Sequence, residues 1–301
     1  MKYATASAFR AALEKRIVTQ AHDTGVPVMR LRKLVIFDRL MARLLVVAKD
    51  RWILKGAVAL DFRLGARFRT TKDMDIARQD GEDAATADFI AAQSIDLGDY
   101  FIFAIQKTVK LDAVLENAAV RYHVSVELAG RPFEEAVVDV GFGDPLVFEP
   151  EFVRGPDLLT FAGIDPVEVP ALPLDNQVAE KVHAYTKSYH GGHPSSRVKD
   201  LIDLVVLSSH CRFQAGHIRG TLSAVFELRN THSLPTKLPA PPREWIRPYR
   251  KLAIDIALDP DISAGYDQTA AFLDPVLHEA LSDEAFWDPG SQAWLPGSTT
   301  S

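Results

Sequence analysis

Apolar residues recur along the chain with two different periods, which separates helices from strands. Helical spacing is found over residues 5–23, 28–49, 57–64 and 82–95. Short runs with strand-like patterns occupy residues 51–55, 73–77, 100–108, 120–128 and 133–140. The first half of the chain is therefore predicted to combine helices with strands.

Proline and glycine become frequent after residue 141, and the pattern changes there to short strands and turns. Beyond this region helical patterns dominate, over residues 175–188, 197–208, 213–229, 242–258 and 265–281. We predict a first domain over 1–150, a mainly helical lobe over 151–285 and a tail over 286–301. The tail is expected to be mobile because proline and glycine recur at this end of the chain.

The composition of the 301-residue chain, 47% hydrophobic and 25% charged, is that of an ordinary globular protein large enough for two cores. Its N-terminus has no apolar signal core, and no segment reaches the ~18 uninterrupted apolar residues of a membrane span. We therefore expect a cytoplasmic protein without a membrane partner. The single cysteine, Cys211, excludes an intrachain disulfide framework and a cysteine-rich zinc site.

The charge is unevenly distributed. The net charge of −6 argues against wholesale nucleic-acid binding, but residues 30–72 hold twelve lysines and arginines against three aspartates. One hypothesis is that this basic segment follows the backbone of a polyanionic substrate, with Arg39 and Arg43 exposed. The alternative is a solvated helix face whose long side chains cover the core.

Two carboxylates stand one residue apart in the run Asp73-Met74-Asp75-Ile76-Ala77. In a strand they point to the same face, while Met74 and Ile76 point to the opposite, buried face. Their repulsion is tolerable if a divalent cation lies between them, and Mg²⁺ is held in this way together with substrate phosphates. A solvated strand edge is the alternative interpretation.

Two further positions favour a site near this acid pair. Gly56 precedes a short predicted helix, where a glycine lets backbone N–H groups approach a phosphate. Asp139 interrupts the apolar strand Ala136–Val140 and needs a partner such as a metal or an arginine. It could complete a three-acid site with Asp73 and Asp75, or form a structural ion pair.

Several motifs follow one another in a fixed order. They are Lys55-Gly56, Arg69-x-x-Lys72-Asp73-x-Asp75, Asp139 on a strand, Glu180-Lys181-x-His183-Ala184, Arg197-x-x-Asp200-Leu201-x-Asp203-Leu204 and Pro241-Pro242-x-x-Trp245. Over about residues 28–258 the chain resembles the AbiEii family of nucleotidyltransferase toxins, and within that family most of all the group called MenT in mycobacteria.

The resemblance implies an α+β fold, with a polymerase-β-like nucleotidyltransferase core of mixed sheet and helices and a helical C-terminal lobe. It implies two Mg²⁺ ions held by Asp73, Asp75 and Asp139. Lys181 matches the lysine that contacts the triphosphate, and Asp200 matches the acid of the last motif. The implied NTP-binding residues are Lys55, Gly56, Ala57, Arg69, Lys72 and Arg197.

Two single positions add to this resemblance. Thr71 stands where some members of the family are silenced by phosphorylation. Ala57 follows Gly56 where polymerase-β-like enzymes usually have Ser or Gly, so a hydroxyl contact to the phosphates is lost. Backbone N–H groups remain, and we expect a weakened phosphate cradle.

The function implied by the resemblance is that of a toxin in a toxin–antitoxin or phage-defence pair. It would add nucleotides from NTP to an RNA 3′ end, by family likeness that of transfer RNA, and so block translation. Its partners would be NTP, the RNA acceptor and a cognate antitoxin protein. Two alternatives stay open: an NTP-binding regulator without transfer, which Ala57 favours, and a phosphotransferase acting on protein or a small molecule.

Overall fold

The computed structural model describes residues 1–111, 119–143, 148–187 and 197–297. The chain forms two compact units. The first holds the described residues of 1–66, 70–144 and 150–172, and the second those of 67–69, 145–149 and 173–301. Among the described residues, no helix is both long and apolar enough to cross a membrane.

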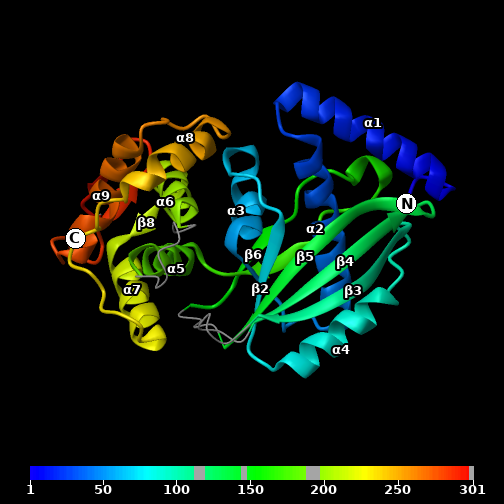
Figure 1. Ribbon diagram of the computed structural model, residues 1–301, viewed down its shortest axis with the longest axis horizontal. Coiled ribbons are helices and arrows are strands. Elements are labelled where there is room, and N and C mark those ends of the chain that lie inside the picture. The colour runs from blue at the N-terminus through cyan, green and yellow to red at the C-terminus, as the bar shows by residue number, and fades with distance from the viewer. Residues whose placement is uncertain (112–118, 144–147, 188–196, 298–301) are drawn as a thin grey trace. The chain divides into compact units, whose positions relative to one another are not determined.

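A mixed sheet is the centre of the first unit, and its described strands follow the order β3-β4-β5-β2-β1-β7-β6 (Figure 1). They are β1 (Ile53–Lys55), β2 (Asp73–Arg78), β3 (Phe101–Leu111), β4 (Ala119–Leu128), β5 (Arg131–Phe142), β6 (Glu151–Arg154) and β7 (Glu168–Ala171). β2 is parallel to β5, and β1 is parallel to β7. β1–β2, β3–β4, β4–β5 and β6–β7 are antiparallel pairs. The predicted α+β fold with a mixed sheet is confirmed.

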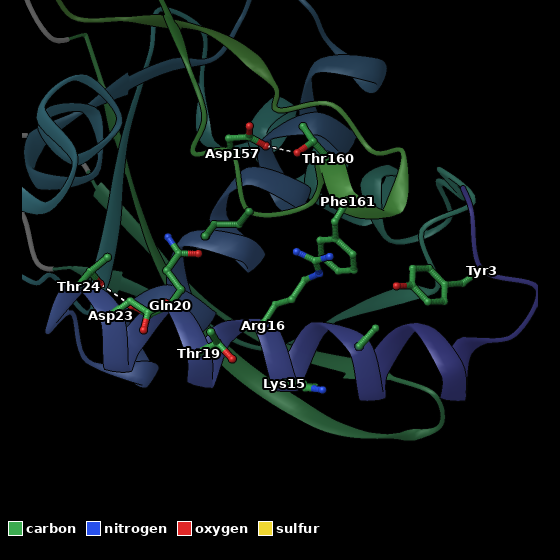
Figure 2. A pocket seen from close by; sticks show the side chains of 12 residues that line it. Tyr3, Lys15, Arg16, Thr19, Gln20, Asp23, Thr24, Asp157, Thr160 and Phe161 are labelled. Atoms are coloured by element: carbon green, nitrogen blue, oxygen red, sulfur yellow. Dashed lines mark hydrogen bonds between the residues drawn. The ribbon is translucent and has the colours of Figure 1, made fainter.

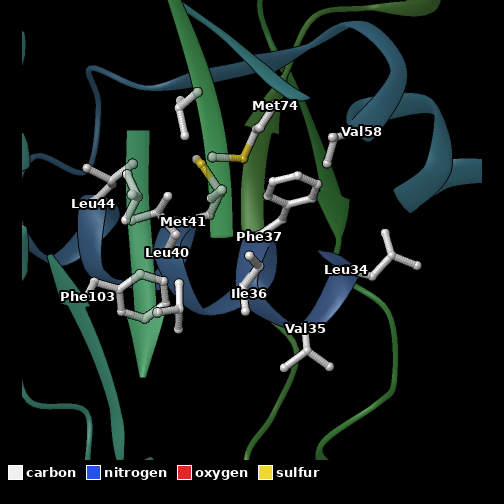
Figure 3. Close-up of a cluster of buried hydrophobic side chains, with 14 of the residues drawn as sticks. Leu34, Val35, Ile36, Phe37, Leu40, Met41, Leu44, Val58, Met74 and Phe103 are labelled. Carbon is white, nitrogen blue, oxygen red and sulfur yellow. The ribbon is translucent and has the colours of Figure 1, made fainter. Parts of the chain in front are cut away.

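Helices α1 (Ala6–Thr24), α2 (Val28–Val47), α3 (Gly56–Leu64) and α4 (Glu82–Gln93) accompany this sheet. α2 supplies much of the core, and Figure 3 shows its apolar side chains gathered with those of Met74 and Phe103. Met74 and Ile76 are fully buried, whereas Asp73 and Asp75 are only half-buried. The alternation predicted for β2 is therefore confirmed.

Two arginines of the basic segment 30–72 do not lie on the exposed surface that one hypothesis required. Arg39 and Arg43 are 5% and 1% exposed, because α2 is packed on several sides. Arg43 donates to both oxygens of Asp99 at 3.0 and 2.6 Å, and the Nε of Arg39 donates to Asp38 at 2.8 Å. The expectation that these two arginines are exposed was wrong, since ionised side chains inside a core need such partners.

The second unit is mainly helical. It contains α5 (Leu174–Thr186), α6 (Val198–His210), α7 (Ala215–Arg229), α8 (Ile246–Ile254) and α9 (Ile262–Leu277). A small antiparallel sheet of β8 (Phe213–Gln214), β9 (Phe286–Asp288) and β10 (Ala293–Leu295) completes its described part. α5 packs against α6 and α7, and α6 packs against α8 and α9.

The tail differs from the mobile segment predicted for 286–301. Trp287 is fully buried, and its indole N–H donates to the backbone oxygen of Ser208 at 2.7 Å. Trp294 stacks on Phe272 with 5.8 Å between ring centroids. Burial of the two tryptophan rings outweighs the conformational entropy that the neighbouring prolines and glycines lose. Residues 286–295 are therefore held in place. Residues 298–301 lie outside the described part of the chain.

The first unit also extends beyond the predicted limit at residue 150. β7 pairs with β1 through Leu54 and Ala171, and β6 pairs with β7, so residues 151–171 complete the sheet. The sequence did not show to which unit these short strands belong, because their pairing partners lie far away in the chain.

Gly265→Ala should destabilise the second unit. A Cβ at this position would lie 1.9 Å from the hydroxyl oxygen of Tyr249, which is fully buried, so α8 and α9 would have to separate. We expect a loss of about 1–3 kcal/mol or more in the free energy of unfolding. Gly220→Ala is the matched control: its Cβ meets nothing within 4 Å inside helix α7, and we expect a gain of about 0.5–1 kcal/mol. Urea unfolding of both variants measures the difference, and equal stabilities would contradict the close packing.

Candidate active site

A row of charged residues crosses four neighbouring strands of the first unit. Lys55 of β1 lies opposite Asp75 of β2, Asp75 lies opposite Asp139 of β5, and Asp139 lies opposite Arg121 of β4. Residues in register on adjacent strands share a face of the sheet. Asp73 lies two residues before Asp75 and shares this face as well. The register therefore brings the three predicted carboxylates together on one surface.

Gly56 brings the chain close to one of these acids. It is the first residue of α3, has φ +62°, and a Cβ there would lie 2.3 Å from the Oδ2 atom of Asp75. Any other residue would be strained in this backbone conformation and would push the carboxylate away. The sequence predicted a close approach to phosphate at Gly56; the close approach in the structure is to Asp75. Ala57, the next residue, is buried.

Arg121 is a member of the row that sequence reasoning missed. Its Nε and Nη2 atoms donate to the two oxygens of Asp139, each at 2.7 Å. The hydrogen bonds that Arg121 donates to Asp139 raise the pKa of Arg121 above its usual range, and the charges of Asp73 and Asp75 act in the same direction. The positive charge of Arg121 therefore interacts with all three carboxylates. Only the strand register identifies it, since Arg121 is otherwise one cation in an alternating strand.

The donor set fits magnesium in its chemistry. Three carboxylates on one face are ligands that Mg²⁺ prefers, and Asp73, Asp75 and Asp139 would hold it. Across the described residues, however, no group of three or more acidic, histidine or cysteine side chains is close enough to hold a metal ion. Both oxygens of Asp139 are bonded to Arg121, so coordination by Asp139 requires a rearrangement of that pair.

A second charged cluster lies in the second unit and contains four of the predicted residues. Asp203 is its centre and is fully buried. Arg69 donates to the two oxygens of Asp203 at 2.6 and 2.8 Å, and the Nζ atom of Lys181 donates to Asp203 at 2.5 Å. Asp200 lies 3.9 Å from Lys181 and 3.5 Å from Arg197.

The pKa values of the two aspartates of this cluster shift in opposite directions. Burial alone would raise the pKa of Asp203, but the charges of Lys181 and Arg69 outweigh it and lower the pKa below the ordinary 3.8. Burial raises the pKa of Asp200, although Lys181 opposes the shift. Asp203 therefore stays ionised as the shared counter-ion of two cations. In the sequence, the signal for this role is the position of Asp203 one helical turn after Asp200.

The other predicted residues lie around the row. The hydroxyl of Thr71 donates to the backbone oxygen of Asp73 at 3.0 Å, so a phosphate on Thr71 would remove this bond. Lys72 is exposed, and Lys55 is half-buried immediately before α3. The predicted site residues thus fall into two clusters, one in each unit.

A pocket of about 630 Å³ opens elsewhere on the first unit, between α1 and residues 157–161 (Figure 2). Arg16 covers the ring of Phe161 at 4.3 Å, and Thr160 donates to Asp157. Its polar side chains are mostly occupied by one another or exposed on α1. None of the predicted site residues lines this pocket.

The first unit thus combines a mixed sheet with paired aspartates on one strand, a third on the neighbouring strand and a helix that begins at a glycine. The chain belongs to the AbiEii family, because the family model described as nucleotidyl transferase AbiEii toxin, Type IV TA system, matches residues 39–288.

One solved structure agrees with this fold. The chain is similar to MenT4, a nucleotidyltransferase toxin from Mycobacterium tuberculosis H37Rv, with a TM-score of 0.53 and 18% identity over 91% of this chain and 99% of that one. JHP933 from Helicobacter pylori is a more distant match, with a TM-score of 0.44 and 15% identity over 82% of this chain and 92% of that one. The comparison with curated proteins gave no match.

Proposed function

We propose that this protein is the toxin of a toxin–antitoxin pair and transfers a nucleotide from NTP to an RNA 3′ end in a Mg²⁺-dependent reaction. The RNA is by family likeness a transfer RNA, and its modification would block translation in the cytoplasm until a cognate antitoxin intervenes. The observation that carries the chemistry is the row in which Asp75 and Asp139 lie in register beside Gly56.

The residues of the two clusters have different proposed roles. Asp73, Asp75 and Asp139 would hold the divalent cations, which when bound would supply charge neutralisation for in-line displacement at the α-phosphorus. The backbone N–H groups at the start of α3 orient the phosphates, without the hydroxyl that Ala57 lacks. Lys181 has three N–H donors, so its bond to Asp203 leaves others for a phosphate contact, the role that the family likeness implies for it. Asp203 and Asp200 keep this lysine in place, and Arg69 and Arg197 in turn hold these two aspartates.

The RNA requires a basic surface other than the segment 30–72. Four exposed cations follow one another at spacings of four, three and one residues from the turn before α8: Arg243, Arg247, Arg250 and Lys251. Helical periodicity places them on one face, opposite the buried Trp245 and Tyr249. Among the described residues no acidic side chain pairs with them. This stripe, the α8 basic face, is the proposed docking surface for the RNA backbone.

Purified protein, total cellular RNA and each NTP in turn, labelled on the α- or the γ-phosphate, test the proposal. Label from the α-phosphate should appear in RNA, label from the γ-phosphate should not, and EDTA should abolish the transfer because the acids lose their cations. Incorporation of the γ-label into protein or a small molecule would identify a phosphotransferase. Binding of NTP without any transfer would identify a regulator.

The same assay tests the α8 basic face. Arg247→Glu with Arg250→Glu should raise the Michaelis constant for RNA and leave that for NTP unchanged, and the effect should shrink as salt rises. Lys15→Glu with Arg131→Glu makes the same change in net charge at two exposed positions of the first unit and serves as the control. Equal effects of the two double variants would show a response to net charge alone.

A further inference from the structure

The pair formed by Arg121 and Asp139 holds both oxygens of a carboxylate that the proposed function requires for metal binding. The two side chains are 35% and 18% exposed, so the pair lies at the accessible surface of the sheet. Coordination of a cation by Asp139 uses at least one of the same oxygens. The guanidinium and the cation therefore compete for Asp139, and each can occupy it in turn.

The surroundings indicate more than a cross-strand ion pair that stabilises the sheet. An ordinary ion pair joins one acid to one cation. Arg121 interacts electrostatically with Asp73 and Asp75 as well as with Asp139. The other cation of the row, Lys55, lies at its opposite end across from Asp75. Arg121 thus has the charge and the position of a cation that belongs to the acid cluster itself.

A displaced guanidinium has a second partner available. Its planar fork of donors matches the oxygens of a phosphate as well as those of a carboxylate. NTP bound at the row would bring phosphates to the same face together with their divalent cation. The exposure of Arg121 leaves its side chain room to turn, because no layer of protein covers it completely.

We propose that Arg121 is an exchangeable cation of the active site: it neutralises the carboxylates, yields Asp139 to a divalent cation, and then binds the triphosphate of NTP. This inference rests on the proposed function. Arg121 would thereby keep the affinity for the cation alone low and couple cation binding to the arrival of NTP.

Binding measurements test the exchange without relying on activity. Mn²⁺ is titrated into the free protein and followed by electron paramagnetic resonance, and NTP binding is measured separately with excess Mn²⁺. Arg121→Gln should bind Mn²⁺ alone about tenfold more tightly, since a positive charge next to the site is removed. Its affinity for NTP should fall about tenfold or more, since a charge-assisted contact is lost. Opposite signs of the two changes are the signature of exchange.

Two further variants make the result interpretable. Arg121→Lys keeps the charge without the fork, so its affinity for Mn²⁺ alone should stay near that of the wild type while NTP binding weakens. Arg154→Gln removes an exposed arginine of β6 and should change neither affinity. If Arg121→Gln weakens both affinities or leaves Mn²⁺ binding unchanged, Arg121 merely orients Asp139 and the exchange is refuted. If neither the wild-type protein nor Arg121→Gln binds Mn²⁺, with or without NTP, the metal site of the proposed function fails as well.

Discussion

Asp75→Asn and Asp139→Asn should each lower nucleotide transfer by about three orders of magnitude or more, because each replaces a carboxylate of the proposed metal site by a neutral amide. The same change at Asp83 is the control, since this acid is exposed on the first turn of α4 and should keep full activity when replaced. The measurement is incorporation of α-labelled NTP into RNA under saturating Mg²⁺.

The folded state should survive these substitutions. Asp75→Asn removes one of the like charges on the row, so the stability of the protein without metal should stay the same or rise. Asp139→Asn takes the charged partner from Arg121, but that side chain is 35% exposed and water can solvate it. Near wild-type activity of either variant would exclude that residue from the site, whereas a large fall in thermal stability would assign it a structural role.

The elements of the fold could be predicted where local sequence decides them. β2 is an example: one strand with period-two alternation fixes which of its residues are buried, and the burial of Met74 and Ile76 follows. The charged residues of α2 could not be placed in the same way. Arg43 lies 56 residues from Asp99, its buried partner, and no local pattern records a pair of that separation.

The same distinction applies to the candidate site: the local sequence shows some of its residues, and contacts between distant parts of the chain determine the others. The acid pair on β2 and the acid in the apolar run of β5 stand out locally, since a carboxylate among buried neighbours requires a partner. The identity of the partner depends on strand register. Arg121 becomes visible only when β4 and β5 pair antiparallel and place it opposite Asp139. Lys181 was assigned from a motif, but the motif did not show that Asp203 holds it.

Asp203→Ala should destabilise the second unit by about 3–5 kcal/mol, because it leaves two buried cations without their counter-ion. Arg69 and Lys181 both donate to Asp203, and both side chains are 11% exposed. Asp267→Ala, at an exposed position of α9, should change the free energy of unfolding by less than about 0.5 kcal/mol. Tryptophan fluorescence during urea unfolding reports mainly on this unit, which holds Trp245, Trp287 and Trp294 of the four tryptophans.

A double variant separates loss of the ion pairs from loss of packing. Lys181→Met removes one of the two cations, so Asp203→Ala should cost less in that background than in the wild type. Equal costs in both backgrounds would mean that the ion pair with Lys181 contributes nothing to the effect of Asp203. For activity, Lys181→Met by itself should lower transfer by about two to three orders of magnitude if the lysine contacts the triphosphate.

The pH dependence of stability gives an independent measure of the same aspartate. The pKa of Asp203 in the folded protein lies below the ordinary value of 3.8 because of Lys181 and Arg69. The stabilisation from its ionised form is therefore complete above pH 3.8 and is lost as the pH falls through the lowered pKa. Asp203→Asn lacks this contribution at every pH, so the difference in unfolding free energy between wild type and variant should be constant at neutral pH and should shrink in strong acid. A difference that instead falls as the pH rises above 3.8 would show that Asp203 is protonated in the folded protein, and its role as the counter-ion of Lys181 and Arg69 would then be excluded.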